Sequence, residues 1–210
     1  MKTATWIDDQ LRHRGIDDER VLDAMRRVPR ELFVPPDLRG HAYDDAALPL
    51  AYGQTVSQPF IVAYICRGLA LRGGERVLDV GTGSGYQAAV LGELAGDVHS
   101  VEVIPELAES ARAALELAGA GNVEVHEGDG ALGLPELGPF AGIAVAAAAN
   151  EIPPALGAQL EDGGRLALPL GGRRKQELCV FERDGERLRL VSSLPVRFVP
   201  LVTGPARSIG

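Results

Sequence analysis

The amino-acid sequence predicts an α/β fold in which a doubly wound, mostly parallel sheet follows N-terminal helices and precedes a C-terminal β-hairpin. Two observations carry this prediction. From Gly73 onward, short β-branched runs alternate with helical segments rich in Ala and Leu. This βαβ order, with right-handed crossovers, gives a parallel sheet covered on both faces. Further on, Asp184-Gly185 joins two more strand-like runs, which is a strong local signal for a hairpin.

The N-terminal region, residues 1–72, is predicted to combine helices with an irregular segment. Residues Thr5 to Val28 have the pattern of two short helices broken at Gly15, the second with one apolar face. Prolines and glycines recur too often between Pro29 and Pro59 for long regular structure, so this stretch is expected to be ordered loop. A helical pattern resumes from Phe60 to Leu71.

The central region, residues 73–170, is predicted to form the α/β core, and residues 171–210 a β-rich segment. The strand-like runs of the core are RVLDV, DVHSVEVI, NVEVHEGD, AGIAVAAAA and GRLALPL. No internal repeat or low-complexity linker separates the three regions. All 210 residues, 46% of them hydrophobic, are therefore expected to share one core in a single domain.

Charge and composition exclude several classes of function. The net charge of -8 argues against a nucleic-acid partner, because such proteins normally carry a basic stripe. The cations of GGRRKQ, residues Gly171 to Gln176, are expected in a solvated hairpin loop. No run approaches the roughly 20 apolar residues of a membrane span, and the N-terminus lacks the apolar stretch of a signal peptide. We expect a cytoplasmic monomer that binds neither nucleic acid nor membrane.

Cysteine and histidine spacing gives no sign of a metal site or a disulfide. Cys66 and Cys179 lie far apart without a CxxC pair, so we expect buried free thiols. The four histidines are scattered and lack the usual spacing of zinc ligands. The sequence therefore predicts no bound metal.

A glycine-rich turn is the first candidate for a binding site. The stretch LDVGTGSGY places Gly81, Gly83 and Gly85 directly after a predicted strand and at the start of a predicted helix. Glycines there let the backbone turn tightly and approach a ligand. The spacing is GxGxG rather than the GxGxxG of dinucleotide folds, and Asp79 precedes it. A nearby carboxylate disfavours a pyrophosphate, whereas a sulfonium with an amino-acid tail can use it.

Two further acids stand at the ends of the next two predicted strands. Glu102 in HSVEVI can accept both hydroxyls of a ribose, and Asp129 in EGDG can accept the exocyclic amine of an adenine. Each acid alone could be structural: Asp79 as a cap of the turn, the other two as solvated strand ends. Three acids at successive strand ends, where ligands bind in open α/β sheets, favour a nucleoside site.

These motifs resemble a known family. DVGTGSGY, VE and GDG together resemble the class I S-adenosylmethionine-dependent methyltransferases. More narrowly, the chain resembles the protein-L-isoaspartate O-methyltransferases in VPRELFVP, AYDDAALPL, GQTVSQP, GTGSGYQAAVL, EGDG, NEIPPAL and FVPL, which occur in this order. The resemblance implies a Rossmann-like fold and S-adenosylmethionine as cofactor. It also implies methyl transfer to the free α-carboxylate of L-isoaspartyl residues in damaged proteins, which starts repair through a succinimide.

The same resemblance implies which residues act. In the uncharged loop GQTVSQP, Ser57 is the implied catalytic residue, Thr55 and Val56 help shape the peptide groove, and Gln58 lies beside the cofactor. An isoaspartyl carboxylate is already ionised at neutral pH, so it needs aiming more than a strong base. Val199, Pro200 and Leu201 of FVPL are assigned to the substrate. The other expected cofactor-binding residues are Asp79, Gly81, Thr82, Gly83, Ser84, Gly85, Glu102, Val103, Asp129 and Gly130.

Several alternatives stay open at this point. Ser57 could instead cap the helix that begins near Pro59. Ala141 stands where the family usually has Asp after PF, a departure that we expect to be structural. The run Ala146 to Ala149 could mark a strand end that substrate backbone approaches, or could pack against a helix. As a second function, a class I methyltransferase could act on a dedicated peptide or a small carboxylic acid.

Overall fold

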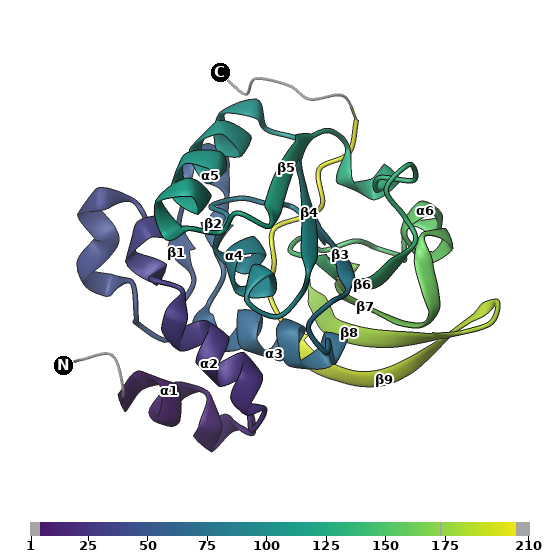
Figure 1. The fold of residues 1–210 in the computed structure, drawn as a ribbon, viewed down its shortest axis with the longest axis horizontal. Helices are drawn as coiled ribbons and strands as arrows, with labels where there is room; N and C mark the ends of the chain where they lie inside the picture. Colours follow the sequence, from purple (N-terminus) through teal and green to yellow (C-terminus); the bar gives the residue numbers. More distant parts are fainter. Residues whose placement is uncertain (1–4, 173, 205–210) are drawn as a thin grey trace.

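The computed structural model describes residues 5–172 and 174–204, and its centre is a sheet of seven strands (Figure 1). The strands are β3 (Arg76–Val80), β4 (Asp97–Glu102), β5 (Val123–Glu127), β6 (Phe140–Val145), β7 (Leu160–Gly172), β8 (Lys175–Asp184) and β9 (Arg187–Val196). Their order across the sheet is β5-β4-β3-β6-β7-β8-β9. The first five strands in this order are parallel, and β8 and β9 are antiparallel. The predicted mostly parallel sheet is therefore confirmed.

Helices cover the two faces of the sheet unequally. On one face lie α2 (Glu19–Arg27), α3 (Pro59–Leu69), α4 (Tyr86–Gly92) and α5 (Pro105–Ala118), and their apolar side chains share a core with Val77 of β3. On the other face Leu78 and Val80 of β3 pack with Leu156 of the short helix α6 (Pro154–Ala158). Successive strand residues face opposite sides, so β3 contributes to both cores.

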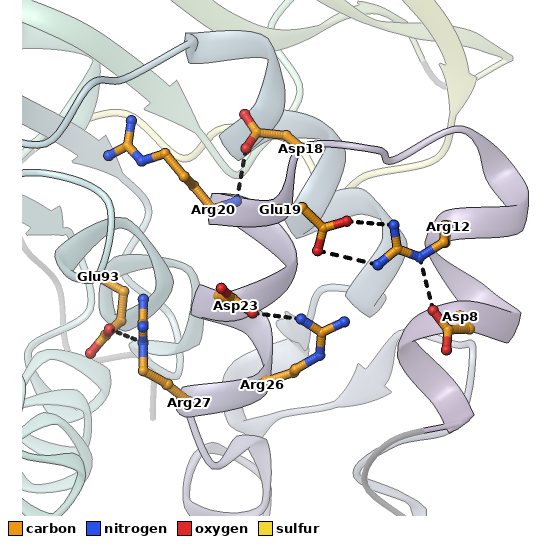
Figure 2. A network of polar contacts seen from close by, with 9 residues as sticks. All are labelled: Asp8, Arg12, Asp18, Glu19, Arg20, Asp23, Arg26, Arg27 and Glu93. Atoms are coloured by element: carbon orange, nitrogen blue, oxygen red, sulfur yellow. Dashed lines mark hydrogen bonds and ion pairs between the residues drawn. The ribbon is translucent and has the colours of Figure 1, made fainter.

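The N-terminal helices are held against the domain by ion pairs as well as by apolar contacts. Helix α1 (Thr5–Gln10) and the 3₁₀ turn η1 (Arg12–Arg14) end at Gly15, as the sequence predicts, and α2 follows. Figure 2 shows Arg12 between Asp8 and Glu19, with Nε 2.9 Å from Asp8 and Nη1 2.5 Å from Glu19. At the far end of α2, Arg27 reaches Glu93, just after α4, at 2.6 Å. These exposed pairs link η1 to α2 and α2 to the residue that follows α4.

The proline-rich stretch before α3 is ordered but irregular, as expected. It contains the 3₁₀ turns η2 (Arg30–Phe33), η3 (Pro36–His41) and η4 (Ala51–Gly53), with the short strands β1 (Leu48–Pro49) and β2 (Thr55–Val56). Strands β1 and β2 pair antiparallel, Leu48 opposite Val56. This small sheet holds the loop before α3 in place.

At the C-terminal end, the hairpin predicted at Asp184-Gly185 joins β8 to β9, with Asp184 paired to Arg187. The GGRRKQ segment links β7 to β8, although its residue 173 lies outside the described residues. Ala141 is the second residue of β6, where the pairing with β7 shifts register. Among the described residues, no helix combines the length and apolar character that crossing a membrane requires.

Candidate active site

The glycine-rich turn carries the chain from the end of β3 into α4. Gly83 and Gly85 have φ of 54° and 87°, in the left-handed region that other residues rarely adopt. A Cβ on Gly85 would also lie 3.3 Å from Cγ of Leu115 in α5. The amides of Gly81 and Thr82 donate to the Val101 carbonyl at 2.9 and 3.3 Å. The turn is therefore tied to the end of the neighbouring strand β4.

Glu102 ends β4 and is anchored by backbone donors. Its Oε2 accepts a hydrogen bond from the Gly83 amide at 2.8 Å, and its Oε1 accepts from the amides of Val103 and Ile104, both at 3.0 Å. The residue is only 5% exposed. A carboxylate has about four acceptor positions, so the three backbone amides leave Glu102 about one position for a hydroxyl donor.

Asp79 lies beneath the turn in a buried polar chain. Gln87 Nε2 and Ser100 Oγ donate to its two oxygens, each at 2.7 Å, and Ser100 Oγ lies 2.6 Å from Thr82 Oγ1. Burial raises the pKa of Asp79 to about 6, although these hydrogen bonds oppose the rise. The carboxylate thus fixes the side chain of Gln87, in the first turn of α4.

A cavity opens where the turn, the ends of β4 and β6 and the loop before α3 meet. The far wall comes from residues 199–202, distant in sequence. Backbone hydrogen bonds of 2.8 Å, from the Ala148 amide to the Val199 carbonyl and from the Leu201 amide to the Ala148 carbonyl, hold this segment in place. The alanine run thus follows the end of β6 and pairs with another segment of the chain.

Most residues predicted from the sequence come together around this cavity. The substrate and catalytic candidates that line it are Thr55, Val56, Ser57, Val199, Pro200 and Leu201. The cofactor candidates that line it are Gly81, Thr82, Gly83, Ser84, Glu102, Val103 and Gly130. The uncharged loop and the glycine turn therefore face one space, although Ser57 and Gly83 belong to different parts of the chain.

Four predicted cofactor residues do not line the cavity. Asp79 is fully buried behind the turn, and Gly85 is the N-cap residue of α4. Asp129 is a cap: its Oδ1 accepts from the Ala131 amide at 2.9 Å and its Oδ2 from the Gly204 amide at 2.6 Å. Gln58 lies in a neighbouring groove, because its Nε2 donates to Asp45 Oδ1 at 2.6 Å. These four residues therefore do not face the cavity in this structure.

The alternative role of Ser57 as a helix cap is not seen. Helix α3 has Gln58 at its N-cap position, without a side-chain cap, and Pro59 as its first residue. Proline at this position has no amide hydrogen to satisfy. Ser57 instead borders both the cavity and the neighbouring groove.

Sequence reasoning missed several cavity residues, of which Gln87 is the most informative. Its Oε1 is buried and has no hydrogen-bond partner among the described residues, while its Nε2 is taken by Asp79. A buried acceptor without a partner is costly unless a ligand supplies a donor. In the sequence, the only sign of a role for Gln87 is that it directly follows the motif GTGSGY. The other missed residues are Gln54, Val62, Val80, Tyr86, Val101, Ile104 and Val202, whereas Ala146 and Ala147 belong to the alanine run considered from the sequence.

Comparison with known proteins agrees with this geometry. The family model described as protein-L-isoaspartate(D-aspartate) O-methyltransferase matches residues 2–206. The chain belongs to this family. It is therefore an S-adenosylmethionine-dependent methyltransferase of L-isoaspartyl residues, as the motifs predicted.

Two sequence relatives within the family match over almost their full length. The chain is 54% identical over 203 residues to a protein-L-isoaspartate O-methyltransferase of Anaeromyxobacter dehalogenans (strain 2CP-C), covering 95% of this chain and 97% of the relative. It is 50% identical over 198 residues to one of Roseiflexus castenholzii, covering 94% and 91%. A solved protein-L-isoaspartate O-methyltransferase superposes with a TM-score of 0.84 at 29% identity, covering 97% of this chain and 67% of that chain.

One further structure bears on the fold alone. A putative protein-L-isoaspartate O-methyltransferase from Plasmodium falciparum, solved in complex with S-adenosyl-L-homocysteine, has a TM-score of 0.81 at 23% identity. The superposition covers 95% of this chain and 98% of that chain. The arrangement of sheet and helices is therefore common to family members of low sequence identity.

Proposed function

We propose that Ser57 aims the α-carboxylate of an L-isoaspartyl residue at the methyl group of S-adenosylmethionine, across the cavity between the loop before α3 and the glycine turn. One observation carries this proposal: Ser57 and the glycine turn line the same cavity. The loop Thr55 to Gln58 brings no charge to that space. An acid here would repel the carboxylate, and a cation would pair with it and blunt its attack.

The residues present fit S-adenosylmethionine. Glu102 keeps about one acceptor position for a ribose hydroxyl beside its three backbone bonds, and the unpartnered Oε1 of Gln87 can accept from the ammonium of the amino-acid tail. Gly83 lets the ligand approach backbone. Gly130 is required by packing, because a Cβ there would lie 2.5 Å from Val80 Cγ1. Asp79 acts through Gln87 as a positioning residue.

The chemistry requires orientation more than proton transfer. When bound, S-adenosylmethionine supplies an electrophilic sulfonium methyl, and its transfer to a carboxylate oxygen yields a methyl ester and S-adenosylhomocysteine. The carboxylate is ionised at neutral pH, so Ser57 has no proton to remove and its hydroxyl holds the carboxylate in line. Orienting two bound reactants can supply about 7 to 11 kcal/mol of a barrier.

The peptide is proposed to lie in the groove beside the cavity. This groove is bordered by Thr55, Ser57, Phe60 and residues 194–198, at and just after the end of β9. Because Thr55 and Ser57 border both spaces, a peptide in the groove can pass one carboxylate between them into the cavity. We also propose a cytoplasmic monomer that needs neither nucleic acid nor membrane; the charge of -8 and the two free thiols support this.

A paired-peptide assay tests the assignment. Two peptides of one sequence, one with L-isoaspartate and one with normal aspartate, are incubated with the protein and methyl-labelled S-adenosylmethionine. In the isoaspartyl form the free carboxylate lies one methylene closer to the main chain, and a misplacement near 1 Å can reduce rate about a hundredfold. The isoaspartyl peptide should be methylated at least that much faster. Label should then appear as methanol, because the next amide nitrogen attacks the ester to form a succinimide.

The same assay separates the alternative function. Equal methylation of both peptides would contradict the proposed aiming by Ser57. Labelling of neither peptide, together with methylation of a small carboxylic acid or one dedicated peptide, would favour the second function.

A further inference from the structure

A cluster of His99, Glu124 and His126 lies outside the cavity and has no part in the proposed reaction. The register of β4 and β5 places His99 opposite Glu124. His126 follows two residues later on β5, and residues two apart on a strand share a face. His99 and His126 are far apart in the chain, which is why histidine spacing predicts no metal site.

The three side chains point their ligand atoms at one another. His99 Nδ1 lies 3.1 Å from His126 Nε2 and 3.7 Å from Glu124 Oε2, and His126 Nε2 lies 3.9 Å from Glu124 Oε1. In a tetrahedral zinc site with Zn–N near 2.0 to 2.1 Å, two ligand atoms are about 3.4 Å apart. The spacing of the cluster is thus close to that of three zinc ligands before any rearrangement.

A fourth residue, Asp97, orients the most buried ligand. Asp97 Oδ2 lies 3.1 Å from His99 Nε2 and also accepts from Arg76 Nε at 2.8 Å. If Nε2 carries the hydrogen, Nδ1 of His99 presents its lone pair toward His126. Metal-bound histidines in proteins are commonly held by a carboxylate in this way.

We propose that His99, Glu124 and His126 bind one Zn²⁺ ion, with solvent as the fourth ligand, and that the ion ties the edge strand β5 to β4. Two imidazoles and one carboxylate are a normal zinc ligand set. Strand β5 is at the end of the sheet and pairs only with β4 among the described strands, so a bridging ion would stabilise its attachment. The His126 side chain is 23% and Glu124 67% exposed, so the ion can enter from solvent.

Zinc titration of the full-length chain tests this proposal. The protein is stripped with a chelator, and Zn²⁺ is titrated by calorimetry and by competition with a chromophoric chelator. The expected result is one Zn²⁺ per chain and a raised melting temperature. His126→Ala should abolish this saturable binding and the thermal shift. His41→Ala, which removes an exposed histidine 2.8 Å from Asp44, is the matched control and should retain both.

Two conservative variants keep the test decisive if His126→Ala fails to fold. Glu124→Gln retains size and should bind Zn²⁺ at least about tenfold more weakly. Asp97→Asn leaves all three ligands and should weaken binding about 10- to 100-fold, the usual effect of losing a ligand's supporting carboxylate. The proposal is overturned if the wild-type chain shows no stoichiometric binding. It is also overturned if His126→Ala, or Glu124→Gln where His126→Ala is unfolded, binds Zn²⁺ as the control does.

Discussion

Replacing Asp79 with asparagine should stabilise the protein by an amount that increases as the pH rises from about 4 to about 7. Asp79 is fully buried and accepts hydrogen bonds from Gln87 and Ser100. An asparagine can keep its oxygen toward Gln87 and donate its amide to Ser100, whose hydroxyl remains free to donate to Thr82. Asp79→Asn therefore removes one buried charge with little loss of packing or hydrogen bonding.

The expected magnitude follows from the pKa of Asp79. Burial raises it from 3.8 to about 6, so between these pH values the folded chain holds a proton that the unfolded chain has released. Stability is lost as the pH rises through this window. At about 1.4 kcal/mol per pKa unit, the full loss is about 3 kcal/mol, of which about 2 kcal/mol develops between pH 4 and pH 7. Asparagine does not titrate, so the variant should gain this amount relative to wild type.

Urea unfolding of both proteins at pH 4, 5, 6 and 7 measures the effect. The difference in free energy of unfolding, variant minus wild type, should rise steadily with pH. Glu19→Gln is a control of opposite sign, because the hydrogen bond from Arg12 lowers the pKa of Glu19. The free energy of unfolding of Glu19→Gln, minus that of wild type, should fall as the pH rises through the acid range. A pH-independent difference for Asp79→Asn would refute the reasoning that burial sets its pKa.

Three further substitutions test the proposed site. Glu102→Gln should weaken S-adenosylmethionine binding by about 1.5 to 3 kcal/mol in calorimetry, since a charged acceptor of a ribose hydroxyl becomes neutral; unchanged affinity in a folded variant would remove Glu102 from the site. Ser57→Ala should lower kcat roughly 10- to 100-fold with cofactor affinity and melting temperature nearly unchanged; full turnover would exclude the aiming role. Gly130→Ala should cost about 1 to 3 kcal/mol of stability because its Cβ would meet Val80, whereas Gly121→Ala, with open space around it, should be near neutral in thermal melting.

Local pattern determined much of this protein without the structure. Strand and helix alternation, the break at Gly15 and the hairpin at Asp184-Gly185 depend on neighbouring residues, so the sequence alone predicts them. The place of Glu102 at the site can also be predicted from the sequence, because the C-terminal ends of parallel strands meet at one edge of the sheet. The short α6 was missed, since five residues carry too little periodicity to distinguish a helix.

Only the tertiary structure decided which of the candidate side chains face the cavity. Asp79 and Glu102 look equivalent in the sequence, yet α4 covers Asp79 and leaves Glu102 at the cavity wall. Gln58 turns away because Asp45, distant in sequence, binds its amide. The pairing of Ala148 with Val199 and of His99 with His126 likewise depends on strand register and chain closure over long separations. Such contacts are set by how the whole core packs, and no local pattern of residues encodes them.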